Sequence, residues 1–196
     1  GVDISCDFVS AVLELSEPTL DDTMPDTERL ALAAQDAFDG CTEVKLTYHT
    51  VKKLAKTLRD ANFKVQIAGT LDMGVLTVMD VTGKLDAPMI GCAIDIGTTT
   101  VTGVLLNLET GEASAGNGQI RYGADVINRI VEQSKPGGVK RLQDAILKET
   151  LVPLTAVMCK SAGITADRIL RAAVASNTTM NHLLLGVDAD PVRMEP

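Results

Sequence analysis

One stretch decides the fold of this chain: Ala93-Ile94-Asp95-Ile96-Gly97-Thr98-Thr99-Thr100. The apolar run before Gly97 predicts a buried strand, and the glycine and threonines after it predict a tight turn. The apolar residues at 101–108 predict a second strand, and the polar residues at 109–112 predict another turn. The stretch therefore indicates a hairpin that carries a carboxylate, Asp95, near the end of its first strand.

The residue types in this hairpin suit a triphosphate and its magnesium ion. Gly97 lets backbone amides approach phosphate oxygens closely, and the threonine hydroxyl groups can donate hydrogen bonds to those oxygens. Asp95 can hold Mg²⁺ directly or through water. The same residues also allow a plainer interpretation, in which the hairpin is merely rich in threonine and Asp95 caps its own turn.

The residues after the hairpin predict alternating helices and strands. An amphipathic helix is expected at 124–134, and a longer one at 139–162 with Gly163 as its C-terminal stop. A buried strand is predicted at 169–175, followed by a helix that opens with a polar cap and spans 176–185. Residues 89–196 are thus predicted to form one α/β domain.

The first part of the chain predicts a smaller unit. Its expected elements are, in order, a strand at 9–15, a helix after Pro25, a helix at 51–61 capped by Thr50, and strands at 65–68 and 75–79. Gly, Pro and charged residues gather at 83–88, where the periodicity breaks. We place the domain boundary near Pro88, which gives a small α+β domain at 1–88 and a second domain at 89–196.

Composition and charge disfavour several classes of function. The 196 residues are 45% hydrophobic and 22% charged, as expected for a packed globular protein. A formal charge of -8, with three Phe, two Tyr and no Trp, leaves little basic or stacking surface for nucleic acid. No apolar run approaches the ~20 residues of a membrane span, and no signal peptide is recognised. We therefore expect a cytoplasmic protein that binds neither nucleic acid nor membrane.

The cysteines predict no metal cluster. Cys6, Cys41, Cys92 and Cys159 lie more than thirty residues apart, whereas zinc and iron-sulfur ligands usually come in close pairs. We expect buried free thiols in a reducing compartment.

The chain starts with Gly1 and its last residues complete no evident element, so we also expect that both ends were cut from a longer protein.

Several segments together resemble one known family. The segment 93–100 resembles the first phosphate motif of the acetate-kinase, sugar-kinase, chaperone and actin superfamily. The segments NGQIRYGADVINRI (117–130) and NTTMNHLLLG (177–186) resemble, in order and spacing, the reductive activators of corrinoid proteins. Residues 18–22 and 26–30 resemble the start of that family's middle domain, so the likeness covers most of the chain.

The resemblance implies a fold, a function and a set of ligands. The second domain would be the first lobe of a ribonuclease H-like domain with a mixed sheet. The whole protein would use ATP and Mg²⁺ to return cob(II)alamin to cob(I)alamin in a corrinoid protein of a methyl-transfer system. Its iron-sulfur cluster would belong to a domain absent from this chain, which would be inactive alone. The corrinoid protein would be the partner, and a homodimer is left open.

The resemblance also assigns site residues by position. Asp95 would be the catalytic residue and the magnesium ligand. The expected nucleotide contacts are Asp95, Gly97, Thr98, Thr99, Thr100, Asn177 and Thr178. The last two open a helix directly after a strand, so their amides could face the same cleft. Simple N-capping explains them equally well.

Four further polar residues are weaker candidates. Gln119 and Asp125 could orient a water or a metal, but a loop hydrogen bond and a first-turn acid explain them as well. His182 lies in an apolar helix, where we expect packing or a partner contact rather than cobalt ligation. His49 has less to favour it.

Two other functions stay open. One is a small-molecule kinase of the same superfamily, for which Asp125 is the only candidate base. The other is a non-catalytic module in which residues 1–88 dock a partner or dimerise. The docking hypothesis predicts that Asp95→Ala leaves partner affinity unchanged, whereas the activator hypothesis predicts that ATP-dependent changes disappear.

Overall fold

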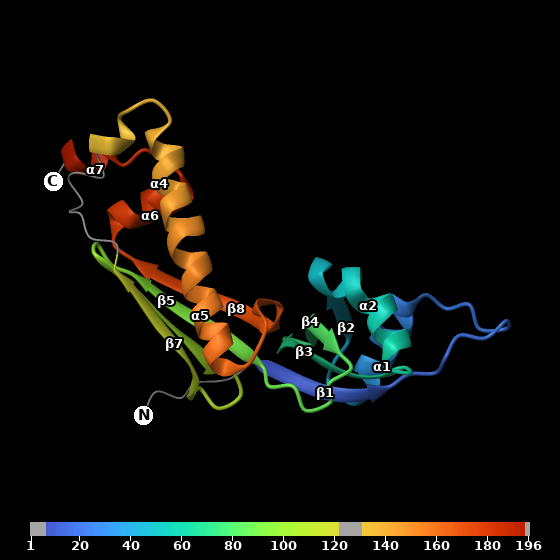
Figure 1. Ribbon diagram of the computed structural model, residues 1–196. Coiled ribbons are helices and arrows are strands. Elements are labelled where there is room, and N and C mark those ends of the chain that lie inside the picture. Colours follow the sequence, from blue (N-terminus) through green and yellow to red (C-terminus); the bar gives the residue numbers. More distant parts are fainter. Residues whose placement is uncertain (1–6, 122–130, 195–196) are drawn as a thin grey trace. The chain divides into compact units, whose positions relative to one another are not determined.

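The computed structural model describes residues 7–121 and 131–194. The chain divides into two compact units, one of residues 1–89 with 108–111 and the other of residues 90–107 with 112–196 (Figure 1). Each unit contains a four-stranded sheet with both parallel and antiparallel pairs. The predicted α/β fold class, with a mixed sheet in the second domain, is therefore confirmed.

The first unit alternates strands and helices. Its elements are β1 (Phe8–Glu14), α1 (Asp26–Ala37), β2 (Glu43–Leu46), α2 (Tyr48–Asp60), β3 (Lys64–Asp72) and β4 (Val75–Thr82). The sheet order is β1-β3-β4-β2, in which β1 and β4 run antiparallel to β3 and β2 runs parallel to β4. The short strand β2 was not predicted, because its four residues give too little alternation to identify.

The core of the first unit lies between its helices and one face of its sheet. Leu30 and Ala34 of α1 and Leu54 and Leu58 of α2 are buried there against alternate residues of the strands, which include Val65, Ile67, Leu76 and Val78. The predicted apolar stripes of both helices therefore face the sheet.

The predicted cap of α2 is wrong by one turn. Thr47 is the N-cap and accepts from the Thr50 amide, while the buried Thr50 hydroxyl donates to the Val78 carbonyl.

The segment that leaves β4 is fixed by the side chain of Gln66 on β3. The Gln66 amide group donates to the Ala87 carbonyl over 2.6 Å, and its oxygen accepts from the Ala87 amide over 3.1 Å. Both residues are buried, so these bonds are shielded from water. One side chain thus satisfies two backbone groups that would otherwise be buried without partners.

The second unit is built on an antiparallel hairpin. Its elements are β5 (Ile90–Ile96), β6 (Thr100–Asn107), β7 (Ala113–Arg121), α4 (Gly138–Ile146), a π-helical turn (Leu147–Leu151), α5 (Val152–Ala162), a short 3-10 turn (Ala166–Arg168), β8 (Ile169–Ser176), α6 (Thr178–Leu185) and α7 (Asp190–Met194). The sheet order is β7-β6-β5-β8, and β8 runs parallel to β5.

Helix α5 covers one face of this sheet (Figure 1). A side chain at Gly103 would lie 2.8 Å from the Met158 sulfur, and one at Gly118 would lie 2.8 Å from Leu154. The two glycines therefore let the helix approach β6 and β7 closely. Alternate residues of β5, including Ile94 and Ile96, are buried on this face.

Two predictions for the second unit need correction, and one of its strands was not predicted. The helix expected at 139–162 is interrupted at 147–151, because Pro153 lacks an amide hydrogen and its ring crowds the carbonyl one turn earlier. Strand β8 has its predicted place, but its side chains at 171–175 are exposed rather than buried. The strand β7 was missed, because its glycines and polar residues hide the strand pattern. The helix predicted at 124–134 lies largely outside the described residues.

Candidate functional site

The turn between β5 and β6 has the shape that the sequence predicted. The Gly97 amide donates to the Thr100 carbonyl over 2.9 Å and closes the turn. A side chain on Gly97 would place its Cβ 2.8 Å from that same carbonyl oxygen, so the turn requires glycine on steric grounds. Thr98 is half-buried and Thr99 is exposed, so the hydroxyl of Thr99 is accessible to a ligand.

Asp95 lies on the face of the sheet opposite to α5. The alternation of strand residues puts Ile94 and Ile96 into the core and leaves Asp95 exposed. In the sheet register, Thr102 of β6 and Ala175 of β8 lie directly beside it. The carboxylate is therefore available to a ligand on this open face.

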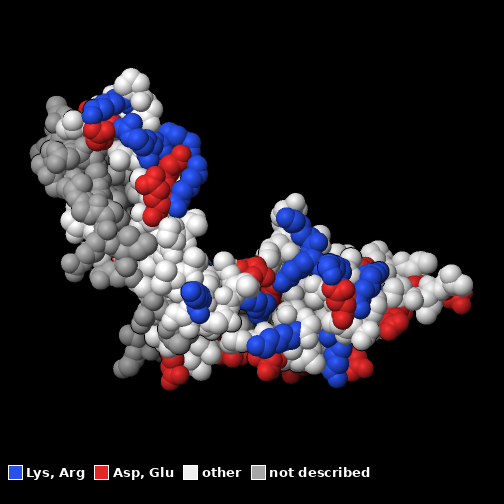
Figure 2. Space-filling view, in the orientation of Figure 1, with Lys and Arg blue, Asp and Glu red and all other residues white. Residues whose placement is uncertain are grey.

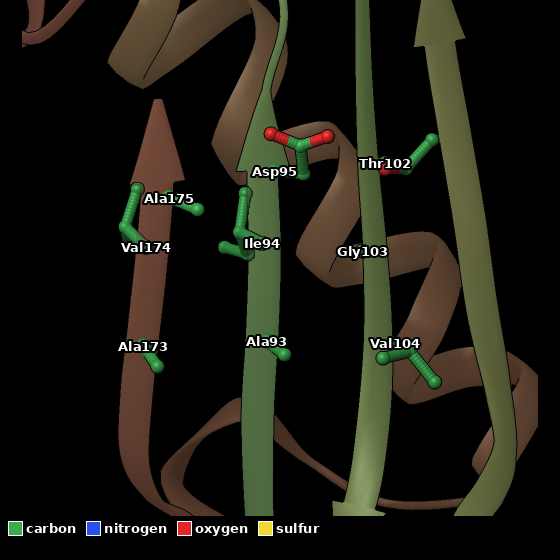
Figure 3. A pocket seen from close by; sticks show the side chains of 9 residues that line it. All are labelled: Ala93, Ile94, Asp95, Thr102, Gly103, Val104, Ala173, Val174 and Ala175. Atoms are coloured by element: carbon green, nitrogen blue, oxygen red, sulfur yellow. The ribbon is translucent and has the colours of Figure 1, made fainter. Parts of the chain in front are cut away.

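A shallow hollow of about 410 Å³ lies along this face (Figure 3). Its wall is mainly apolar, and Asp95 and Thr102 supply its polar side chains. The residues that line it are Ala93, Ile94, Asp95, Thr102, Gly103, Val104, Ala173, Val174 and Ala175.

The junction of β8 and α6 lies beside the hairpin turn, at the edge of the sheet where β5 and β8 end. Because β5 and β8 are parallel neighbours, their carboxyl ends lie together. Asn177 is the N-cap of α6, and its Oδ1 accepts from the Met180 amide over 2.9 Å. Its Nδ2 donates to the Thr98 hydroxyl over 3.2 Å. Asn177 therefore caps a helix and contacts the hairpin turn at once.

Thr178 and Thr100 lie beside these contacts. Thr178 is exposed and is the first residue of α6, where backbone amides have no partner within the helix. Thr100 is half-buried and begins β6, paired with Arg121 of β7. The hydroxyl of Ser176, which precedes the cap, is hydrogen-bonded to Asn181. The site thus joins two short segments, 95–100 and 176–178.

The structure adds Thr102 and Ser176 to the residues that the sequence singled out. Thr102 could have been found, because an antiparallel hairpin that turns at 97–100 pairs it with Asp95. Ser176 carried no comparable signal. Of the weaker candidates, Gln119 of β7 is in register with Thr102, and Asp125 lies outside the described residues.

The two histidines lie in separate places. The Nδ1 atom of His182 is 2.8 Å from the Thr178 carbonyl oxygen on its own helix. His49 belongs to α2, where its Nε2 atom is 3.7 Å from a carboxylate oxygen of the buried Asp80. Across residues 7–121 and 131–194, no three His, Cys, Asp or Glu side chains are close enough together to bind a metal ion.

The described cysteines are free thiols. Cys92 and Cys159 are buried and Cys41 is half-buried, while Cys6 lies outside the described residues. Burial raises the pKa of Cys92, with a smaller contribution from Cys159, and burial also raises the pKa of Cys159. Both thiols therefore stay protonated at neutral pH and are poor metal ligands and poor nucleophiles.

Comparisons with known proteins identify the family. Residues 90–196 match the model of the RACo middle region, and residues 2–86 match the model of the RACo linker region. The chain belongs to the RACo family. This membership confirms the resemblance to reductive activators of corrinoid proteins that the sequence motifs indicated.

Two relatives of this chain show how much of a longer protein it matches. The corrinoid activation enzyme RamQ of Eubacterium limosum is 34% identical over 116 residues, which are 57% of this chain and 19% of RamQ. A solved structure described as a reductive activator for corrinoid, iron-sulfur protein has a TM-score of 0.68 and 34% identity over 97% of this chain. The match covers 31% of that solved chain, so this chain spans less than a third of either relative.

In the part of the chain that the structure describes, no helix combines the length and apolar character needed to cross a bilayer.

Proposed function

We propose that this chain is the nucleotide-binding part of an ATP-dependent reductive activator, which returns cob(II)alamin to cob(I)alamin in a partner corrinoid protein. The observation that supports this most is the meeting of Asp95, Thr98 and Asn177 at one edge of the second unit's sheet. The names of the relatives support the corrinoid partner, since one is a corrinoid activation enzyme and the other a reductive activator.

The residues present fit Mg²⁺ and a triphosphate. Mg²⁺ is usually held by one or two carboxylates, with substrate phosphates and water as the other ligands. Asp95 is an exposed carboxylate, so it can supply the one carboxylate that such a site needs. The turn amides after Gly97, the hydroxyls of Thr98 and Thr99 and the first amides of α6 would donate to phosphate oxygens.

Nucleotide binding would act by shifting a conformational equilibrium. A ligand can shift such an equilibrium only by the difference between its affinities for the two states. ATP hydrolysis supplies the free energy for the unfavourable electron transfer onto the corrinoid. The contribution of this chain is to hold the phosphates, and the contact between Asn177 and Thr98 ties their binding to the start of α6.

The electron would come from outside the described residues. The iron-sulfur cluster implied by the family needs close thiolate ligands. Cys92 and Cys159 are buried with raised pKa values, which disfavours the thiolate form. We therefore assign to this chain the nucleotide and partner steps, and we assign no redox centre to it.

Isothermal titration calorimetry with Mg-ATP on the whole protein tests the proposal. Asp95→Asn should lower the affinity at least about tenfold, because the carboxylate is the proposed metal contact. Glu149→Gln, which changes an exposed carboxylate on the π-helical turn of the same unit, is the matched control and should bind like the wild type.

Reduction of cob(II)alamin, followed by its absorbance, is the second readout. It should require ATP and fail in Asp95→Asn. Equal affinity and equal reduction in Asp95→Asn would refute the proposed role of this site. ATP turnover that depends on a small-molecule acceptor rather than on a corrinoid protein would favour a kinase instead.

A further inference from the structure

The loop between β1 and α1 is longer than the connection requires. It runs from residue 15 to residue 25, whereas most connections in compact domains have ~4–6 residues. Figure 1 shows it projecting from the helices and sheet of the first unit. Long loops that stay ordered are usually functional. The loop also contains one of the family motifs, 18–22, which the nucleotide site does not use.

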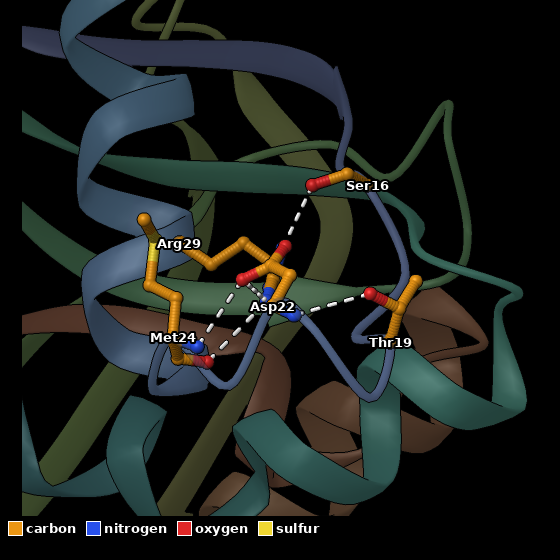
Figure 4. A network of polar contacts seen from close by, with 5 residues as sticks. All are labelled: Ser16, Thr19, Asp22, Met24 and Arg29. Carbon is orange, nitrogen blue, oxygen red and sulfur yellow. Dashed lines mark hydrogen bonds and ion pairs between the residues drawn. The ribbon is translucent and has the colours of Figure 1, made fainter.

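A single buried arginine holds this loop in place (Figure 4). Arg29 of α1 is only 4% exposed, and its two Nη atoms donate to the two carboxylate oxygens of Asp22 over 2.7 and 2.9 Å. The same guanidinium donates to the Ser16 hydroxyl over 2.7 Å and to the Met24 carbonyl over 3.4 Å. It therefore binds both ends of the loop at once. A buried arginine is rare unless paired, so its use here indicates a fixed loop conformation.

The tip of the loop is closed by its own backbone. The amides and carbonyls of Thr19 and Asp22 form a reciprocal pair of hydrogen bonds of 3.2 Å each. The Thr19 hydroxyl also accepts from the Asp22 amide over 3.1 Å. Between them stands Leu20, whose side chain is 100% exposed. The fold thus holds a fully exposed leucine in a defined position rather than on a loose loop.

The charges beside Leu20 are unpaired within the described residues. Glu17 and Asp21 are exposed and make no ion pair with any residue at 7–121 or 131–194. Figure 2 shows acidic atoms at the end of the loop. Three basic side chains of α2 have acidic partners, in the pairs Lys53–Asp80, Lys56–Asp60 and Arg59–Asp26. The loop tip therefore offers one apolar side chain and two free negative charges.

We propose that the segment 17–22 is a docking finger for a protein partner that has an apolar socket bordered by Lys or Arg. The partner we assign is the corrinoid protein, so this inference rests on the proposed function. Leu20 would fill the socket and slow dissociation, while Glu17 and Asp21 would speed association by charge attraction. A pre-ordered finger loses little conformational entropy on binding, which favours affinity.

Binding kinetics measured on the whole protein test the finger. The probe is a purified corrinoid iron-sulfur protein in the cob(II)alamin state, immobilised for interferometry. Leu20→Ala should raise the dissociation constant about tenfold or more, mainly through faster dissociation. Glu17→Gln with Asp21→Asn should slow association and reduce its dependence on salt.

The turn between β3 and β4 provides a matched control. There Asp72 is exposed and Met73 is 95% exposed, so this turn also presents an acid beside an apolar side chain. Met73→Ala and Asp72→Asn should leave both rate constants unchanged. Because Leu20 is fully exposed, Leu20→Ala should also keep the wild-type urea midpoint, which excludes misfolding as the cause.

The outcomes separate the finger from the proposed function. If the wild type binds the probe and Leu20→Ala binds equally well, the finger is refuted and the activator function stands. If the wild type does not bind the probe, the assignment of a corrinoid iron-sulfur protein to the finger is refuted, while the activator function is judged separately by ATP-dependent reduction of cob(II)alamin. If Leu20→Ala abolishes self-association in sedimentation without changing binding to the probe, a second copy of the chain is the occupant and the assignment to a corrinoid protein is refuted.

Discussion

The side-chain amide of Asn177 donates to the hydroxyl of Thr98 over 3.2 Å and joins segments 79 residues apart in the chain. Because the Thr98 oxygen accepts this bond, its own hydrogen is free to point elsewhere and to donate. Under the proposed function it would donate to a phosphate oxygen. The same asparagine caps α6 through the Met180 amide. Asn177 thus orients a ligand-binding hydroxyl and begins a helix with one side chain.

Two substitutions of Asn177 separate these roles. Asn177→Ala removes the cap and the contact with Thr98, and it should lower the free energy of unfolding by about 0.5–2 kcal/mol. Asn177→Ser keeps a capping hydroxyl but is too short to reach Thr98, so stability should fall by a few tenths of a kcal/mol. Both variants should weaken Mg-ATP binding about two- to tenfold, because each loses the hydrogen bond that orients Thr98 and one neutral hydrogen bond contributes about this much. Urea denaturation and calorimetry measure the two effects, and wild-type affinity in Asn177→Ser would contradict the orienting role.

Gly97→Ala should open the hairpin turn. Its Cβ would lie 2.8 Å from the Thr100 carbonyl oxygen, so the closing hydrogen bond must lengthen or the backbone must shift. Such strain costs about 1–3 kcal/mol, which the urea midpoint would report. Thr99→Ala changes an exposed side chain in the same turn and should keep the wild-type midpoint. Equal midpoints for Gly97→Ala and the wild type would mean that the turn tolerates a side chain.

The sequence predicted the parts of the site whose signals are local. The hairpin at 93–108 follows from an apolar run, a glycine and a second apolar run, and the helix expected at 176–185 follows from its polar cap. Both are present at these places. Local signals suffice because turns and caps depend on a few neighbouring residues.

The remaining features depend on contacts that no local pattern contains. The bond between Thr98 and Asn177 exists because β8 pairs with β5, and strand order is a tertiary property. The exposure of β8 could not be predicted either, since an apolar strand has the same pattern whether or not another layer covers it. Arg29 gave no sign of burial, because arginine is mostly exposed and its partner lies in the preceding loop.

The ion pair of Asp22 and Arg29 should make stability depend on pH. Hydrogen bonds from Arg29, and then the Met24 amide, lower the pKa of Asp22 below its ordinary value of 3.8. A carboxylate with a depressed pKa stabilises the folded state above its unfolded pKa and loses that contribution as pH falls through the folded pKa. The difference in unfolding free energy between the wild type and Asp22→Asn should therefore be constant from pH 7 to about pH 5. It should shrink as the pH falls below about 4.

Urea denaturation of both proteins across this range measures the difference directly. Taking the difference cancels the other carboxylates that titrate in the same range, such as Glu132 and Asp144, whose pKa values are also lowered. Asp21→Asn, next to Asp22 but exposed and unpaired in the described part, is the control and should track the wild type at every pH. If the difference in unfolding free energy between the wild type and Asp22→Asn does not change with pH, the pair is not ionised in the folded loop.

Gln66 should be more important for stability than its polar side chain suggests. Replacement by Leu has a similar volume but leaves the buried amide and carbonyl of Ala87 without their partners. Each unsatisfied buried group costs about 1–3 kcal/mol, so the loss of two partners in Gln66→Leu should lower the free energy of unfolding by about 2–6 kcal/mol. Gln35→Leu is the matched control, because Gln35 makes one exposed bond to the Thr42 carbonyl and should cost under about 1 kcal/mol. Equal urea midpoints for the two variants would mean that water or a shifted backbone satisfies Ala87 when Gln66 is removed.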